Sequence, residues 1–154
     1  MKKITTLCTI YKDGKLLLGM KKRGFGAGKW NGFGGKVKDG ETIEESVIRE
    51  TKEEAGIEIK ELEKIGIIDF YFKKAGEIIE VNLFVCKDFT GEPVETEEMR
   101  PEWFPIDALP YDSMWPDDKF WMPLLLEGKK FKGKFVFDGN TNIISHELNI
   151  VEKI

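Results

Sequence analysis

The sequence between residues 35 and 57 reads GKVKDGETIEESVIRETKEEAGI, and this stretch predicts the element around which the fold is built. Thr42 and Glu45 match a Ser/Thr-x-x-Glu capping box, which places a helix start directly after Thr42. Gly56 is suited to end the helix, because glycine readily adopts the left-handed backbone of a C-terminal cap. We therefore expect a helix over Ile43–Ala55.

One face of this helix carries three glutamates, Glu50, Glu53 and Glu54. Like charges three and four residues apart destabilise a helix by about a few tenths of a kcal/mol per pair, so this face needs a compensating partner. Hard divalent cations such as Mg2+ bind through a few carboxylates together with substrate phosphate oxygens. The acid face therefore predicts a metal site for phosphate chemistry.

The alternative is that the charged face is only solvated, as most runs of charge are. Against this, Ile43, Val47 and Ile48 give the helix an apolar side, so it should pack on a core while its acids point into a cleft. Residues 24–35, which precede it, contain six glycines and can bring the backbone close to a phosphate.

The spacing Gly35-x5-Glu41-x7-Arg49-Glu50-x-x-Glu53-Glu54-x-Gly56 resembles the Nudix box, the signature of the Nudix hydrolases. The box departs from its usual pattern at Thr51, where the family favours an aliphatic residue. Residues 20–36, 98–101 and 114–118 further resemble the oxidised purine nucleoside triphosphatase branch, which hydrolyses 8-oxo-dGTP. The resemblance implies an α/β Nudix fold, with a mixed, partly antiparallel sheet between helices in an α/β/α sandwich.

The resemblance also implies which residues act. Glu50, Glu53 and Glu54 would hold Mg2+, for which Mn2+ can substitute, and Glu98 would be a further ligand or the general base. Either Gly35 or Lys36 would offer a backbone carbonyl to the metal. Which glutamate takes the proton from water stays open. Arg49 lies one turn from Glu53 and is expected to orient a glutamate.

Asp117 and Asp118 form the second informative feature, because they stand between Trp115 and Trp121. Two neighbouring carboxyls in an apolar pocket have raised pKa values, and one protonated and one ionised acid present a donor beside an acceptor. Such a pair can read the edge of a purine. The residues alone also allow a simpler role, since aspartate near a helix start favours the helix dipole.

The resemblance favours base recognition, and it places Asn31 at the base and Lys21 near the sugar or phosphate. It gathers the remaining pocket residues from several segments, and for each of them plain core packing is the alternative. These residues are Thr6, Leu7, Phe25, Phe70, Phe72, Ile79, Met99, Trp115 and Trp121.

Composition sets the class of protein. The chain has 154 residues, 41% apolar and 34% charged, which fits a single globular domain over residues 1–154. No apolar run reaches the about 18 residues of a membrane span, and we expect a cytoplasmic protein without membrane contact. Cys8 and Cys86 are expected as buried free thiols. Two cysteines and one histidine exclude a zinc site, and His146 should face solvent on a strand.

Charge is unevenly distributed along the chain. Residues 1–38 carry ten Lys or Arg and one acid, a net +9, and the total of −4 leaves −13 for the remainder. A basic rim beside an acidic metal site would steer a small polyanion, whereas a nucleic-acid binder normally needs a basic total. We therefore expect a small-molecule nucleotide substrate and no nucleic-acid partner. A monomer is expected as well.

Alternation of apolar residues and turn signals predict seven strands, and a second helix should start near Pro116, with Pro123 kinking or interrupting it. A hairpin is expected around Gly139-Asn140. The expected strands are residues 5–11, 15–20, 62–72, 78–87, 102–106, 131–137 and 143–151.

The sequence thus predicts a Mg2+-dependent diphosphatase that converts oxidised purine nucleoside triphosphates, 8-oxo-dGTP or 2-hydroxy-dATP, into the monophosphate and pyrophosphate. One alternative is a Nudix enzyme for normal or methylated purine triphosphates or dinucleoside polyphosphates. Another is a nucleotide-sensing module without catalysis, which would have lost its metal ligands.

Overall fold

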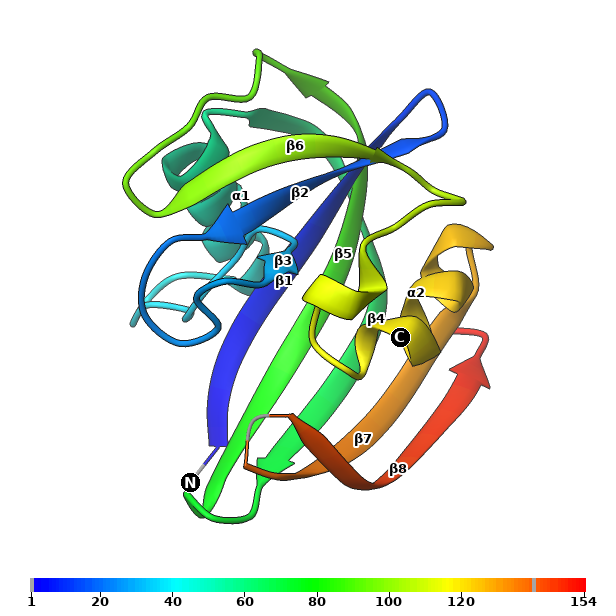
Figure 1. Cartoon of the computed structure of the whole chain (residues 1–154). Helices are drawn as coiled ribbons and strands as arrows, with labels where there is room; N and C mark the ends of the chain where they lie inside the picture. Colours follow the sequence, from blue (N-terminus) through cyan, green and yellow to red (C-terminus); the bar gives the residue numbers. More distant parts are fainter. Residues whose placement is uncertain (1, 140) are drawn as a thin grey trace.

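An eight-stranded mixed sheet forms the centre of the molecule in the computed structural model, which describes residues 2–139 and 141–154 (Figure 1). The strands run in the order β3-β2-β1-β5-β4-β7-β8, and β6 pairs with β2. The β1–β5 and β4–β7 pairs are parallel and the others antiparallel, so the predicted mixed sheet is confirmed. The strands are β1 (Lys2–Lys12), β2 (Lys15–Lys21), β3 (Trp30–Asn31), β4 (Glu58–Phe72), β5 (Glu77–Thr90), β6 (Met99–Pro105), β7 (Lys130–Asp138) and β8 (Asn142–Val151).

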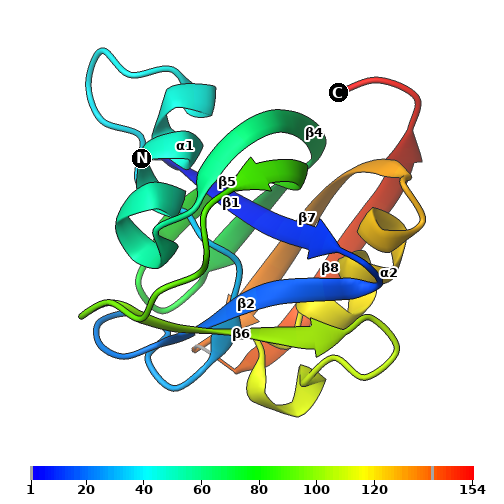
Figure 2. The same ribbon diagram turned by 90° about the horizontal axis from the view of Figure 1, so that it is seen from above.

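Two helices, α1 (Ile43–Ala55) and α2 (Asp118–Leu126), cover opposite faces of the sheet (Figure 2), and a short 3-10 turn, η1 (Tyr111–Ser113), precedes α2. Each helix covers a separate apolar core. Val47 of α1 packs in one cluster, while Trp121 of α2 packs in the other. This is the sandwich that the resemblance implied.

The capping box of α1 is confirmed. The hydroxyl of Thr42 accepts a hydrogen bond from the Glu45 amide at 3.0 Å, and the Glu45 carboxylate accepts one from the Thr42 amide at 2.8 Å. Gly56 ends the helix with a φ of 71°. These local bonds fix the residues at which the helix begins and ends.

The apolar side of α1 differs from the prediction at one position. Ile48 is 42% exposed, because the buried stripe runs through Val47 and Thr51, four residues apart, and Ile48 lies about 100° round the helix from Val47. Thr51 is fully buried, and its hydroxyl donates to the Val47 carbonyl at 2.7 Å. The polar atom of this unusual box residue is therefore satisfied.

The second helix begins two residues after Pro116, as expected, but Pro123 does not interrupt it. The amide of Glu127 still donates to the Pro123 carbonyl at 3.1 Å. Pro123 is exposed, so its ring lies on the solvent side, while the inner face of α2 stays packed through Trp121 and Leu125. Packing of the inner face outweighs the one backbone bond that proline removes.

Several strands are longer than predicted. The strand β1 starts at Lys2 instead of residue 5, β4 starts at Glu58 instead of residue 62, and β5 ends at Thr90 instead of residue 87. The sixth strand starts at Met99 instead of residue 102, because its pairing with β2 extends from Lys15 to Lys21. The short strand β3 inside the glycine-rich segment was not predicted. The β7–β8 pairing confirms the last hairpin, although Asn140 of the expected turn lies outside the described residues.

Three further expectations concern single residues or the chain as a whole. Cys8 and Cys86 are free and buried, as predicted. His146 is exposed on β8, also as predicted, although its ring stacks on Phe135 with 5.3 Å between centroids. Within residues 2–139 and 141–154, no helix combines the length and apolarity needed to cross a membrane.

Candidate active site

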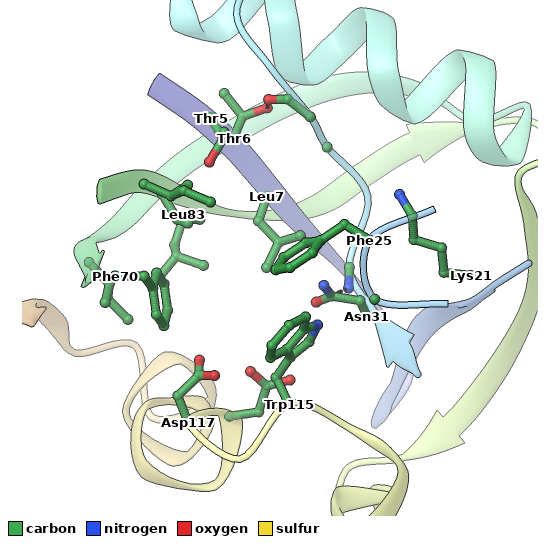
Figure 3. Close-up of a pocket in the computed structure, with 18 of the residues that line it drawn as sticks. Thr5, Thr6, Leu7, Lys21, Phe25, Asn31, Phe70, Leu83, Trp115 and Asp117 are labelled. Carbon is green, nitrogen blue, oxygen red and sulfur yellow. Dashed lines mark hydrogen bonds between the residues drawn. The ribbon is translucent and has the colours of Figure 1, made fainter. Parts of the chain in front are cut away.

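A cavity of about 220 Å3 opens between the sheet, the glycine-rich loop and the start of α2 (Figure 3). All thirteen residues predicted to bind substrate line it, although they come from six separate segments of the chain. These residues are Thr6, Leu7, Lys21, Phe25, Asn31, Phe70, Phe72, Ile79, Met99, Trp115, Asp117, Asp118 and Trp121.

Several lining residues were not predicted. Most of them continue the alternation of the two central strands, where every second side chain of β4 and β5 points into the cavity, or belong to the glycine loop, and Thr5 lies on β1 beside Thr6. The alternation was a usable signal, since Ile68 and Val81 lie two residues from predicted members. The additional residues are Thr5, Gly26, Gly32, Gly34, Ile68, Val81 and Leu83, with Gly35 and Glu54 from the predicted metal site.

The acid pair lies buried at the start of α2, with Asp117 3% and Asp118 2% exposed. The indole nitrogen of Trp121 donates to Oδ2 of Asp117 at 2.8 Å. Oδ2 of Asp118 is buried and has no hydrogen-bond partner among the described residues. An orphaned buried acceptor of this kind costs free energy unless a ligand or a proton satisfies it.

Burial raises the pKa of both carboxyls. The pKa of Asp118 rises further, first through burial and then through the neighbouring charge of Asp117, whereas the Trp121 indole opposes the rise at Asp117 by stabilising its ionised form. The directions of these shifts make Asp118 the favoured proton donor of the pair and Asp117 the favoured acceptor. Asp117 makes no side-chain cap to α2, so capping does not explain it.

Aromatic rings form the wall beside the acid pair. Phe25 lies 5.1 Å from the Trp115 ring and 5.7 Å from the Phe72 ring, measured between centroids. Figure 3 shows Phe25, Trp115 and Asn31 close together, with Asp117 below them at the start of α2. Flat apolar walls with a few polar groups at one end suit a planar heterocyclic base.

The acid face of α1 reaches the cavity through Glu54, which is 6% exposed. Its Oε1 accepts a hydrogen bond from the Gly34 amide at 2.9 Å. Burial raises the pKa of Glu54 to about 8, the Gly34 bond and Lys21 oppose this rise, and Glu50 adds to it. The raised pKa favours the protonated form of this carboxyl.

Arg49 engages the other two glutamates of the face, as expected for an orienting residue. Its guanidinium donates to Glu50 at 2.8 Å and to Glu53 at 3.2 Å. Glu41 holds the guanidinium from the other side at 2.7 and 3.1 Å, and this contact lowers the pKa of Glu41 to about 2. Arg49 thus fixes where two of the carboxylates lie.

The three glutamates share a face but do not converge. Within the described part of the chain, no three acidic, histidine or cysteine side chains lie close enough together to hold a metal ion. The donors nevertheless fit a hard divalent cation, because all are oxygens and the carboxylate of Glu50 lies against the backbone of Gly35. A Cβ at residue 35 would come within 2.9 Å of that carboxylate, so glycine permits the approach.

The two candidate carbonyls differ in their surroundings. The Gly35 carbonyl accepts a bond from the Thr6 amide at 2.9 Å, on the sheet side of the loop. The Lys36 carbonyl accepts weaker contacts of 3.4 Å from Ser46 and Arg49, both on α1. The Lys36 carbonyl therefore faces the helix that carries the acids, and which of the two carbonyls binds a metal stays a prediction.

Glu98 lies apart from the other acids in this structure. Its carboxylate is 45% exposed and pairs with Arg23 at 2.8 Å, which lowers its pKa. The Glu98 charge still contributes to the raised pKa of Glu54. A role for Glu98 as a metal ligand or base stays a prediction.

A mixed sheet between two helices and a capped, acid-faced helix against a glycine loop define the class of protein, and the chain belongs to the Nudix family. Residues 1–125 match the family model described as NUDIX domain. The chain is 51% identical to the zebrafish (Danio rerio) oxidized purine nucleoside triphosphate hydrolase over 152 residues, covering 99% of this chain and 97% of the relative.

Two further proteins support this assignment. The mouse (Mus musculus) oxidized purine nucleoside triphosphate hydrolase is 48% identical over 150 residues, covering 97% of this chain and 96% of the relative. Among solved structures, the mutator MutT protein from Bacillus halodurans superposes with a TM-score of 0.86 at 28% identity, covering 96% and 97% of the two chains. The expected family and fold are thereby confirmed.

Proposed function

We propose that this chain hydrolyses oxidised purine nucleoside triphosphates, 8-oxo-dGTP or 2-hydroxy-dATP, to the monophosphate and pyrophosphate. The observation that carries the proposal is the buried Asp117–Asp118 pair, which lines an aromatic pocket and in which burial raises the pKa of both carboxyls, that of Asp118 most strongly. The names of the zebrafish and mouse relatives support the same substrate class. Removal of such nucleotides would keep damaged bases out of DNA.

Oxidation changes the pattern of donors and acceptors along a purine edge. A single carboxylate could only accept, whereas Asp118 as a donor and Asp117 as an acceptor match an edge that carries one of each. Asn31 adds a carboxamide to the lining of the cavity, and its oxygen already accepts the Gly32 amide at 2.9 Å. The Asn31 NH2 group is thereby oriented as a further donor for the base.

Hydrolysis adds one water across a phosphoanhydride. The water oxygen bonds to phosphorus, the P–O bond to the leaving group breaks, and a glutamate accepts the proton of the water. Glu50, Glu53, Glu54 and Glu98 are the candidates for this base. A divalent cation held by the box glutamates and the Gly35 or Lys36 carbonyl would supply charge neutralisation at the phosphates.

The residues of the chain do the positioning. Lys21 lines the cavity on the Glu54 side, and Figure 3 shows its ammonium directed away from the acid pair. The Lys21 ammonium would bind the polyphosphate and orient it toward the acid face of α1. The Gly34 amide holds the Glu54 carboxyl in place.

Several finer assignments belong to the same proposal. We infer that Mg2+ is the working cation and that Mn2+ substitutes for it, since both are hard ions with oxygen ligands. We also propose that residues 1–154 act as one domain and that the protein is a cytoplasmic monomer without nucleic-acid or membrane partners. Light scattering and activity with each metal test two of these statements directly.

The decisive experiment measures pyrophosphate release over a panel of normal, oxidised and methylated purine triphosphates and dinucleoside polyphosphates. The proposal requires kcat/KM for at least one oxidised purine to exceed that for its normal parent by about tenfold or more. A preference for an unmodified substrate would instead support another Nudix activity. Nucleotide binding without any turnover in Mg2+ would support the sensing alternative.

A further inference from the structure

We propose that Lys29 is a positioning residue for base recognition. Its ammonium packs against the ring of Trp115 and places a positive charge near the buried acid pair. The inference rests on the proposed function, because the base must be read in this pocket for Lys29 to affect it. The Lys29 ammonium lies 5.7 Å from the centroid of the Trp115 ring, within the range of a cation–π contact.

Lys29 lies beside the pocket wall. The described residues that line the cavity include Trp115 and Gly26 from the same region, but not Lys29. Lys29 therefore contacts a residue of the cavity wall without lining the cavity itself. Lys29 can act on recognition only through the ring and through its charge.

The backbone holds Lys29 in place. Its carbonyl accepts the Lys21 amide at 3.2 Å, and its amide donates to the Gly26 carbonyl at 3.2 Å. The loop also packs tightly on the indole, since a Cβ at residue 26 would come within 3.3 Å of the Trp115 ring nitrogen. The four-carbon stem of Lys29 therefore extends from a fixed point.

Trp115 is joined to the acid pair through the backbone. The Asp118 amide donates to the Trp115 carbonyl at 3.1 Å, in the turn that leads into α2. A shift of Trp115 would therefore move the carboxyl whose Oδ2 lacks a partner among the described residues. The Trp115 ring and the Asp118 carboxyl should therefore move together, and Lys29 contacts the Trp115 ring.

The positive charge of Lys29 also acts on the Asp118 carboxyl. Three groups interact electrostatically with Asp118: Asp117 directly before α2, Tyr111 on η1 and Lys29 on the glycine loop. Burial and then Asp117 raise the pKa of Asp118, whereas Lys29 lowers it. The pKa of Tyr111 is itself raised by burial and by Asp118, so this hydroxyl stays neutral.

Removing the cation should therefore move the titration of the pair. A nearby positive charge favours the ionised form of a carboxyl, and its loss favours the protonated form. The donor–acceptor pattern would then persist to higher pH. Selectivity for an oxidised base should follow the same shift, while turnover at saturating substrate should not change.

The test compares Lys29→Met with Lys29→Arg. Lys12→Met is a matched control, because the Lys12 ammonium lies over Phe89 at 5.9 Å, a similar contact outside the pocket. KM and kcat for 8-oxo-dGTP and dGTP are measured from about pH 6 to pH 10. Proton uptake on binding 8-oxo-dGMP is measured by calorimetry in two buffers of different ionisation enthalpy.

We expect Lys29→Met to move the midpoint of the KM ratio, and of proton uptake, upward by about half a pH unit. Lys29→Arg should retain the wild-type midpoint, and Lys12→Met should match wild type. Unfolding curves for all three variants identify any loss that comes from folding alone.

Two results would overturn the inference. An equal rise in KM for both nucleotides at every pH, without a shifted midpoint, would mean that Lys29 binds phosphate. A midpoint shift in Lys29→Arg as large as in Lys29→Met would mean that its charge is not the cause. Absence of any preference for 8-oxo-dGTP in the wild type would instead refute the proposed function, and proton uptake would still report separately on Lys29.

Discussion

The indole nitrogen of Trp121 donates a hydrogen bond of 2.8 Å to Oδ2 of Asp117, four residues earlier in the chain. Both side chains are buried, so the bond is shielded from water. It distinguishes two adjacent aspartates that would otherwise be alike, because it stabilises the ionised form of only one. Because of this contact, Asp117 is the favoured acceptor of the pair and Asp118 the favoured donor.

Trp121→Phe tests that division. The substitution keeps most of the ring packing but removes the donor, which leaves a buried carboxylate unsatisfied at a cost of about 1–3 kcal/mol. We expect lower stability, measured by urea unfolding, and a pH profile of base selectivity that moves to higher pH. A Trp103→Phe variant is a suitable control, since Trp103 lies in the opposite core. An unchanged profile in Trp121→Phe would show that the contact does not set the protonation of the pair.

Local signals were sufficient for the box helix. The capping box, the terminal glycine and the acid face all lie within residues 42–56, so their geometry depends little on the rest of the chain. The misplaced Ile48 shows the limit of such reasoning, because the exact rotation of a helix depends on the sheet beneath it. The persistence of α2 through Pro123 has the same origin, since buried neighbours compensate for one lost bond.

The site was harder to predict than the helix that carries most of its acids. Resemblance to the family located the pocket residues, and the structure brings all of them to one cavity. Their contacts depend on side chains distant in sequence, such as Lys29 over Trp115 and Glu41 on Arg49. The spacing of the glutamates predicted a shared face, but Arg49 and Gly34 decide where each carboxylate points.

Glu54→Gln should lower turnover in Mg2+ by at least about a hundredfold, because it removes a carboxylate from the reacting centre. Lys153→Ala is the control, since Lys153 is exposed near the chain end and should leave turnover and stability near wild type, within about half a kcal/mol. Retained activity in Glu54→Gln would remove Glu54 from the catalytic set.

The same variant has a separate effect on stability. The pKa of Glu54 is about 8 in the folded state, above its ordinary value of 4.5, so the folded protein binds more protons between these values. Stability of the metal-free wild type should therefore fall as pH rises from about 5 to 9. Glu54→Gln should show a smaller fall in EDTA, measured by thermal unfolding. Parallel pH dependence in the two proteins would contradict the raised pKa.

Gly34→Ala should disable the site through the backbone. A Cβ at residue 34 would lie 1.9 Å from the Thr6 carbonyl oxygen, so the loop must move away from β1 and the Gly34 amide must leave Glu54. We expect a loss of activity of about a hundredfold or more together with reduced stability. Ala27→Gly is the comparison, because it changes an exposed position of the same loop without adding an atom. Wild-type turnover in Gly34→Ala would mean that this close approach is not needed.

Asp117→Asn and Asp118→Asn should separate recognition from chemistry. Each replaces an ionisable acid with an amide that cannot exchange its donor and acceptor roles by titration, and a mispaired buried polar group costs about 1–3 kcal/mol. Both variants should raise KM for 8-oxo-dGTP and change its ratio to dGTP, whereas the metal concentration for half-maximal turnover should stay constant.

Because Asp117 is the favoured acceptor and Asp118 the favoured donor, Asp118→Asn retains a donor and should be the milder change. Its selectivity should also lose the pH dependence of the wild type, since the coupled proton is gone. Steady-state kinetics over a purine panel from about pH 6 to pH 9 measure all of these quantities. Wild-type selectivity in both variants at every pH would mean that the base is read by other residues of the pocket.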